Sequence, residues 1–498
     1  MSDGTEAGNQ KLGMIWTAAL AVAALGTWIL YDAHPGLNWL IWTAVAASGL
    51  LLFVRQDKSG KDVVVAMAAV ATILAGGATI TASEFLTVLT FLGIISFLAT
   101  EMLLATNPSW DRISAGFAIP APVVAFGHAI VESVRRAIEA LHLVRSNRAR
   151  SVVGGIAITL PVIVIFALLL SSADPIFAGW RDAIQRLLQN WDFLPRVVFF
   201  FALLSMVLGA YGFVSKGDDS IGLPIGTPRE LNQRWLGVTE RLILISSVTA
   251  LLSLFLIVQV TYLFGNLPQI TGSGVTFADY ARRGFAELSV VASATAVLIL
   301  VSERYGKKDQ REGLLRAITI TLVVAVLFLL GSAFHRVSLY EEAYGFTTAR
   351  LYAQFYMVVV AVGLLLLVAE ILNEIDTRRL FRRIASVATV AFLGLVYWNH
   401  EAWIARKNID RFATTGKLDV GYLVRDLSPN AVPAIVDRLA TLPAPTAAEI
   451  RNALTLHYRE GHQRLKGSWY QWNLARTRAG DALENAGIPV GRAARNPG

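Results

Sequence analysis

The sequence predicts an all-α protein: a polytopic transmembrane helix bundle of about eleven spans, followed by a small helical soluble C-terminal domain. Composition is the first reason. Of the 498 residues, 55% are hydrophobic and only 16% are charged, whereas soluble domains carry roughly 25% charged residues. A chain with a mean hydropathy of +0.53 needs the lipid bilayer as the solvent for much of its surface.

Long apolar runs are the second reason. Runs of about 20 residues, the length that crosses the hydrocarbon core, recur along the chain as far as Trp398. The predicted spans are residues 13–31, 37–54, 63–81, 85–106, 151–171, 196–215, 239–265, 284–302, 316–337, 351–372 and 380–398. The first run is longer than the core of a signal peptide, so we expect it to be retained as a transmembrane helix.

The distribution of Lys and Arg is the third reason, and it gives the orientation. Loops rich in these residues alternate with poorer loops, of which Asp32–Gly36 and Ala82–Glu84 carry none. Because cytoplasmic loops accumulate Lys and Arg, the N-terminus is predicted to be cytoplasmic. An odd number of spans then places the tail after Trp398 outside. The expected location is a bacterial cytoplasmic (inner) membrane.

The chain divides into four predicted regions. Residues 1–106 form an N-terminal four-helix membrane unit, and residues 107–150 form a cytoplasmic amphipathic helix and loop. Residues 151–398 form a seven-helix membrane unit, and residues 399–498 form an extracytoplasmic helical tail. Within 122–150, apolar residues recur at helical spacing, which indicates a helix on the cytoplasmic leaflet or one packed beneath the bundle.

Helix signals in the tail support its helical assignment. Ser428 directly before Pro429 is a helix start, and Thr446 opens a capping box. Ser468 precedes an amphipathic run that ends at Gly487, which we predict as the glycine that stops the helix.

Several chemistries are excluded or left without support. The chain has no Cys, which excludes disulfides and thiolate chemistry. It carries no Walker loop, no His-Glu-x-x-His and no dinucleotide fingerprint, and no two His lie at ligand spacing within one helix. We therefore expect no cofactor and no metal, and the balance favours a protein that is not an enzyme. The net charge of +8 is attributed to cytoplasmic loops, with no nucleic acid as a partner.

Polar residues at the outer ends of the late spans form the candidate site. Tyr280, Arg283 and Glu287 share one helical face, and the last two can pair at i,i+4. Such ionisable residues usually face protein or water, so we expect the eighth, ninth and tenth spans to be neighbours with Glu287 directed into the bundle. The candidate polar site consists of Tyr280, Arg283, Glu287, His335, Glu342, Tyr344 and Arg350.

The alternative reading of these residues is structural. Around Gly345, the sequence is typical of a capped helical hairpin with an aromatic belt, in which Gly345 stops one helix and Thr347 or Thr348 caps the next. Three more polar residues in the spans, Glu101, Gln259 and Glu370, are interpreted as helix–helix hydrogen bonds or snorkelling helix ends.

Four stretches in order along residues 151–435 resemble a known family. They are Ser172–Phe177, Tyr280–Leu288, Tyr340–Tyr352, and the tail stretch that comprises Asn408–Arg411, Gly416–Leu423 and Ser428–Pro433. The chain resembles an uncharacterised bacterial multi-pass membrane-protein family, the domain of unknown function four-one-seven-three, which is related to four-one-five-three. The resemblance implies a multi-pass membrane protein with no established activity.

Three functions remain open. A transporter or permease-like protein, or an envelope sensor, would use a polar site on the extracytoplasmic side, with the lipid bilayer and a small solute, ion or lipid as partners. The alternatives are an outer-face enzyme acting on a lipid-linked substrate and a non-catalytic membrane scaffold or assembly factor. Transporters usually show Gly- or Pro-broken helices in matched halves, and Gly76-Gly77 and Pro161 form no matched pair.

The predicted orientation is testable with fusions. A reporter that is active only in the cytoplasm should work when it is fused after Lys308, because that loop is rich in Lys and Arg. The same reporter should fail after Asn430, in the predicted outer tail. Activity at both positions would contradict the topology.

Overall fold

Helices account for the regular structure of this chain. The computed structural model describes residues 2–54, 60–106, 108–140, 193–216, 236–264, 285–305, 312–373, 375–459, 465 and 467–490. Within these ranges there are helices and turns and no β-strand. The all-α class is therefore confirmed.

Seven of the described helices are long and apolar enough to cross a membrane. They are α1 (Ser2–Leu30), α4 (Glu84–Leu104), α9 (Leu194–Lys216), α10 (Val238–Phe264), α14 (Glu312–Tyr344), α15 (Thr348–Leu372) and α16 (Thr377–Tyr397). The chain is thus an integral membrane protein. The helical form follows from the solvent, because a bilayer offers no water to backbone N–H and C=O groups and a helix satisfies them internally.

Three shorter or more polar helices occupy other predicted spans. They are α2 (Leu37–Leu51), α3 (Lys61–Gly77) and α13 (Phe285–Tyr305). Ten of the eleven apolar runs therefore coincide with helices that the structure describes, and the predicted span at 151–171 lies outside the described residues.

The chain forms two compact units. Unit 1 comprises Met1–Arg112, Gly116–Leu223 and Lys466–Thr477, and unit 2 comprises Ile113–Ala115, Pro224–Leu465 and Arg478–Gly498. Each unit therefore contains membrane helices and part of the C-terminal tail.

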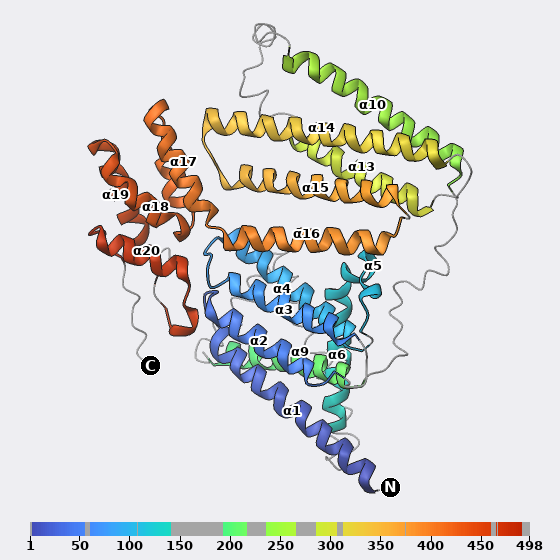
Figure 1. Cartoon of the computed structure of the whole chain (residues 1–498). Coiled ribbons are helices and arrows are strands. Elements are labelled where there is room, and N and C mark those ends of the chain that lie inside the picture. The colour runs from blue at the N-terminus through green and yellow to red at the C-terminus, as the bar shows by residue number, and fades with distance from the viewer. Residues whose placement is uncertain are drawn as a thin grey trace, which may run out of the picture. The chain divides into compact units, whose positions relative to one another are not determined.

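In unit 1, neighbouring helices pack in a simple order. Helix α3 packs against α2 and α4, and α1 packs against α2 and α9. Helix α6 (Ala121–Ala140) crosses α9 steeply (Figure 1). At the crossing, a Cβ on Gly209 would lie 1.8 Å from the carbonyl oxygen of Ala129, and the Ser133 and Ser205 hydroxyls are 2.9 Å apart. Small residues permit this close approach.

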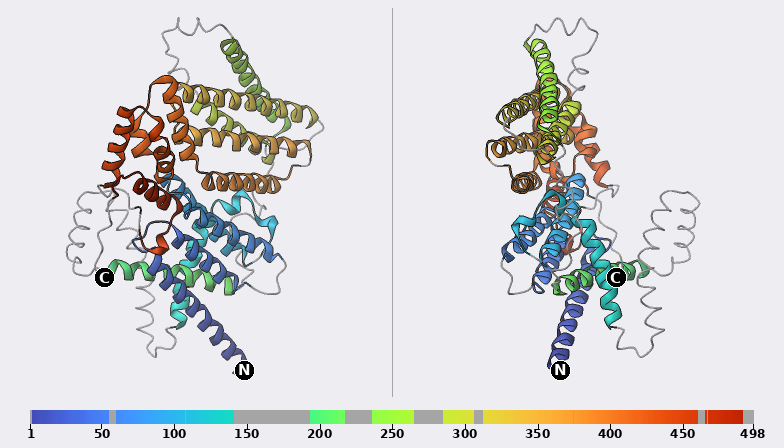
Figure 2. Two further views of the ribbon diagram at one scale, coloured as in Figure 1. Left: turned by 60° about the vertical axis from the view of Figure 1, so that its left-hand side comes forward. Right: turned by 90° about the vertical axis from the view of Figure 1, so that its right-hand side faces the viewer.

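In unit 2, α14 is the central helix, in contact with α10, α13 and α15. Helices α14, α15 and α16 lie side by side in chain order in each view (Figures 1 and 2). Helices α13, α14 and α15, which are the eighth, ninth and tenth predicted spans, contact one another and are neighbours, as expected. Their shared core is apolar and includes Leu252, Ala292, Ile299, Leu322, Val326, Leu329, Met357, Leu364 and Leu367.

The tail is helical, with α17 (His400–Thr415), α18 (Val432–Arg438), α19 (Ala444–Arg459) and α20 (Leu474–Asn485), and a π-helical turn at Tyr422–Asp426. Ser428 caps a short 3-10 turn by accepting from the Asn430 N–H, and Gly487 has a φ of +70° after α20. Both agree with the sequence signals.

Two of the predicted helix starts in the tail are wrong. Helix α19 begins at Ala444, before Thr446, because Pro445 fits the first helical turn, where its missing N–H costs nothing. The Ser468 side chain caps no helix. Instead, Asn473 caps α20 by accepting a hydrogen bond from the Arg476 N–H at 3.0 Å.

The crossing of α6 and α9 makes a stability prediction. Gly209→Ala should destabilise the protein by about 1–3 kcal/mol, because the new methyl group would overlap the backbone of Ala129. Gly127→Ala on α6 is the matched control: nothing lies within 4 Å of its Cβ position, so helix propensity alone should act. Thermal unfolding of the detergent-solubilised protein measures both, and equal midpoints would refute the close crossing.

Candidate functional site

The connection between α14 and α15 has the geometry that its sequence predicts. Gly345, with a φ of +93°, ends α14, and its N–H donates to the Glu341 carbonyl at 2.8 Å. Thr347 caps α15 by accepting from the Arg350 N–H at 3.4 Å. Two helices thus meet in a tight connector of three residues, 345–347.

The tail helix α17 docks on this connector. The Asn408 side chain accepts from the Phe346 N–H at 2.7 Å and donates to the Phe346 carbonyl at 2.8 Å. Arg411, one turn later, donates to the Glu342 carbonyl at 2.8 Å and also to the Ala343 carbonyl. Because Asn408 and Arg411 lie on one face of α17, one helix satisfies the backbone groups that the hairpin leaves unpaired.

The rest of the tail adds to the docking. The Tyr422 hydroxyl accepts from the Thr348 N–H at 2.8 Å. His400, at the start of α17, lies 2.9 Å from the Tyr352 hydroxyl through Nε2 and 3.2 Å from the Trp398 carbonyl through Nδ1. Those partners fit a neutral imidazole that donates through Nδ1 and accepts through Nε2.

Beneath the connector lies a buried carboxyl group. Glu341 is 3% exposed, and one of its oxygens accepts from Gln354 Nε2 at 2.8 Å. The other, Oε1, is buried without a hydrogen-bond partner among the described residues. Beside it, the Arg350 guanidinium lies 4.2 Å from the centre of the Tyr340 ring and donates to the Gly345 carbonyl. Buried polar groups of this kind are costly unless they are paired.

The structure distributes the seven predicted site residues unevenly. Tyr280 and Arg283 lie outside the described residues. Glu287 is exposed, so the expectation that it points into the bundle is wrong. The helical phase of α13 explains this, because Leu288 and Ala292 occupy its buried face.

The other predicted residues lie on the hairpin. His335, Glu342 and Tyr344 are exposed, while Arg350 is half-buried. The Tyr344 ring packs against the Tyr340 ring at a tilt of 32°, with ring centres 4.7 Å apart. Glu342 takes part through its carbonyl oxygen, which accepts from Arg411.

Sequence reasoning missed the buried member of the acidic pair on α14. The buried stripe of α14 runs through Val326, Leu330, Ala333 and Val337, at alternating steps of four and three. Four residues after Val337, the same helical face reaches Glu341, which is buried, whereas the next residue, Glu342, is exposed. The helical period of the apolar residues could therefore have predicted that Glu341 is buried.

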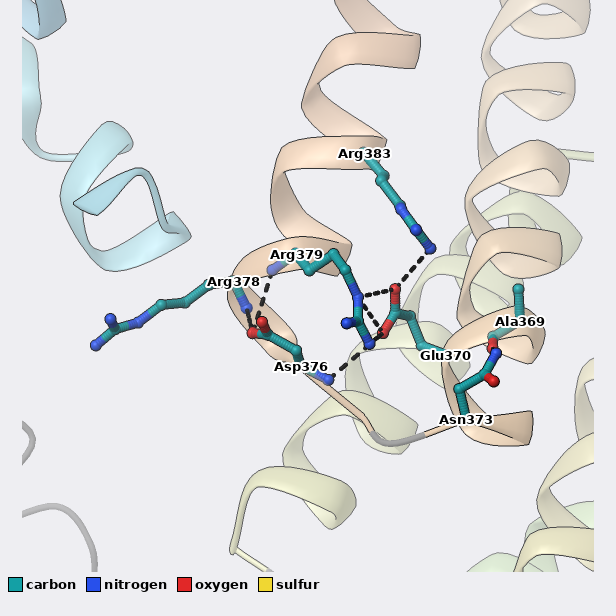
Figure 3. Close-up of polar contacts among 7 residues, drawn as sticks. All are labelled: Ala369, Glu370, Asn373, Asp376, Arg378, Arg379 and Arg383. Carbon is teal, nitrogen blue, oxygen red and sulfur yellow. Dashed lines mark hydrogen bonds and ion pairs between the residues drawn. The ribbon is translucent and has the colours of Figure 1, made fainter. Parts of the chain in front are cut away.

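A second buried carboxyl group lies at the opposite end of α15 (Figure 3). Glu370 is 1% exposed. Its oxygens accept from Arg379 Nε at 2.9 and 3.1 Å, and Arg383 contacts Oε1 at 2.8 Å. Such charge-assisted hydrogen bonds are the strong ones, and here they join α15 to α16.

Asp376 completes that junction by capping α16. Its carboxylate accepts from the N–H groups of Arg378 at 2.9 Å and Arg379 at 3.2 Å (Figure 3). Burial alone would raise the pKa of Asp376, but these hydrogen bonds and the Arg379 and Arg382 charges hold that pKa below its usual range. These contacts hold the end of α15 against the start of α16.

In unit 1, the tail segment 467–477 contacts the connectors that carry no Lys or Arg. Asn473 Nδ2 donates to the carbonyls of Ala78 at 2.8 Å and Thr81 at 2.9 Å. The Leu37 N–H donates to the Trp472 carbonyl at 3.0 Å. The α1–α2 and α3–α4 connectors therefore lie at the same end of unit 1 as this part of the tail.

His400 makes a pH prediction. Burial is the largest influence and lowers the pKa of His400, although Glu401 opposes it. The unfolded chain, with a histidine pKa of about 6.5, then binds more protons than the folded chain. The free energy of unfolding should therefore be unaffected by His400 above about pH 6.5, and it should decrease as the pH falls below that value. His400→Gln should flatten this part of the pH profile of thermal unfolding, and an unchanged slope would contradict the assignment.

The Glu370 junction makes a stability prediction. Glu370→Gln removes the charge that two arginines contact and should cost about 1–3 kcal/mol. Glu342→Gln, at an exposed carboxylate of α14, should cost almost nothing. Unfolding in a denaturing detergent compares the two, and a neutral Glu370→Gln would show that the junction contributes little.

Of the comparisons with known proteins, the one with protein families gives a match. Neither the curated proteins nor the solved structures give a match. Residues 63–438 match the family described as Domain of unknown function (DUF4153), the relative named in the resemblance rather than four-one-seven-three itself. That range contains seven of the described membrane helices in full, most of α3, and the docking face of α17. The chain therefore belongs to the DUF4153 family of uncharacterised proteins.

Proposed function

We propose that this integral membrane protein is an envelope sensor. Its C-terminal tail receives the signal outside the cytoplasmic membrane, and the α14–α15 connector passes it to the helices. The observation that carries the proposal is the docking of α17, in which Asn408 and Arg411 bind backbone groups of the connector. A movement of α17 would change the hydrogen bonds at the ends of two membrane helices.

The placement of charge supports sensing over transport. The buried charged groups in the described membrane helices of unit 2 lie near helix ends: Glu341 in α14, Glu370 in α15, and Arg241 of α10, which lies 2.6 Å from Glu303 of α13. Between them lie an apolar core and threonines that bond their own helix, such as Thr295 and Thr319. Transporters hold their substrates near the middle of the bilayer with polar groups or unwound backbone.

Both units of the chain contain tail residues, which also supports the proposal. Helices α17 to α19 belong to unit 2, while Lys466–Thr477 belongs to unit 1. In unit 1, Asn473 bonds the α3–α4 connector, and in unit 2, Asn408 bonds the α14–α15 connector. A ligand or force that acts on the tail therefore reaches membrane helices in each unit.

A permease-like role is the second candidate, and one observation favours it. The unpaired Oε1 of Glu341 is an acceptor that a small solute or ion entering from the tail side could use. In that role the tail would be a cover over the site, and its loss would leave transport in place.

Genetics distinguishes the two roles. A gene deletion, a truncation after Tyr397 and Asn408→Ala are compared for fitness across envelope stresses, with protein level in the membrane checked in each strain. The proposal predicts that all three share one fitness profile. Arg406→Ala, at an exposed position on the same helix, is the matched control and should behave as wild type. Wild-type profiles for both the truncation and Asn408→Ala would overturn the sensor.

A further inference from the structure

Glu101 is a buried carboxyl group that the docking of the tail does not use. It lies in the last turn of α4, in unit 1. Its side chain is fully buried, and neither of its oxygens has a hydrogen-bond partner among the described residues. Glu370 differs sharply, because two arginines contact its carboxylate.

Among the residues that the structure describes, the helices around α4 bring no counter-charge to Glu101. Those that pack against α4 are α2, α3, α6 and α9. Helix α2 has no titratable residue, and the titratable residues of the other three in the described part are Lys61, Asp62, His128, Glu132, Arg135, Arg136, Glu139, Arg196, Tyr211 and Lys216. The charges of α6 pair with one another, with Arg136 at 3.0 Å from Glu132 and 3.1 Å from Glu139.

Tyr211 is the titratable neighbour that interacts with Glu101, but its hydroxyl proton takes part in another hydrogen bond. Its hydroxyl donates to the Ala46 carbonyl at 2.9 Å. A Cβ on Gly49 would lie 2.1 Å from that hydroxyl, so the phenol is held tightly against α2. Tyr211 therefore leaves the carboxyl oxygens of Glu101 unpaired.

An unpartnered carboxylate in such a place is neutralised by a proton, because burying an isolated charge is far more costly than binding one. The neutral group still leaves a polar O–H without a partner, so an apolar residue would suit the packing better. A buried polar residue that has no partner and does not improve the packing indicates a functional role. Glu101 lies three residues from the end of α4, about 5 Å along the helix axis, and the residues from Met102 to Thr106 are buried with it.

We propose that Glu101 is a proton-binding site of unit 1, which holds a proton at neutral pH and exchanges it with water at the membrane face where α4 ends. A hydronium ion gives its proton to one carboxylate oxygen and leaves as water, and the reverse step returns the charge. By the charge distribution of the loops, this face is the cytoplasmic one. The site would report cytoplasmic acidity, independently of the tail.

The first test uses dicyclohexylcarbodiimide on the full-length protein in detergent micelles at about pH 7. The O–H of a protonated carboxyl group adds across a C=N bond of this apolar reagent. The resulting O-acylisourea rearranges to a stable N-acylurea. Peptide mass spectrometry should find the adduct on Glu101 and not on the exposed Glu84 of the same helix. Glu101→Gln should abolish the labelling, and Glu84→Gln should keep it. An unlabelled Glu101 would overturn the proposal.

Two further measurements separate proton binding from a structural role. The infrared carbonyl band of the protonated carboxyl should be present in wild type, absent from Glu101→Gln, and shifted in D2O; a band that does not shift would refute exchange with water. Glu101→Leu should fold with a thermal midpoint at or above that of wild type. A lower midpoint would show that the carboxyl serves packing, and would also count against the proposal.

Discussion

The bilayer supplies no hydrogen bonds, and this constraint organises the molecule. Inside the spans, helices satisfy their own backbone groups, so the difficulty moves to the connectors where helices end. Asn408 satisfies the α14–α15 connector and Asn473 the α3–α4 connector. At the α15–α16 junction, Asp376 caps the new helix while Glu370 binds its arginines. Side chains from distant or neighbouring segments thus satisfy these three described connectors.

This arrangement supports the role proposed for the tail. A soluble domain that merely hung from the membrane would contact water with its polar faces. Here, Asn408 and Arg411 of α17 instead face the backbone of a membrane hairpin, and Asn473 does the same in unit 1. The contacts are directional hydrogen bonds, which respond to small displacements more steeply than apolar packing does. That property suits a device which converts an event at the tail into a change at helix ends.

The sequence predicted what local pattern encodes. Long apolar runs located the membrane helices, and Gly345, Thr347 and Gly487 end or begin helices as their residue types indicate. It did not predict that Asn408 bonds Phe346, because 62 residues separate them and no periodicity links them. Burial of single acidic residues was also predicted wrongly. Glu287 and Glu341 are both glutamates at a helix end, and which of them is buried depends only on the face that α13 and α14 each turn toward their neighbours.

The tail holds the α14–α15 connector through hydrogen bonds to its backbone. Hydrogen exchange at the amides of Phe346 and Thr348, measured on the full-length protein, tests these bonds. Both amides should exchange slowly in wild type. In Asn408→Ala, Phe346 should exchange fast, while Thr348 keeps the protection given by Tyr422. Fast exchange at both amides in the wild-type protein would show that the tail does not hold the connector.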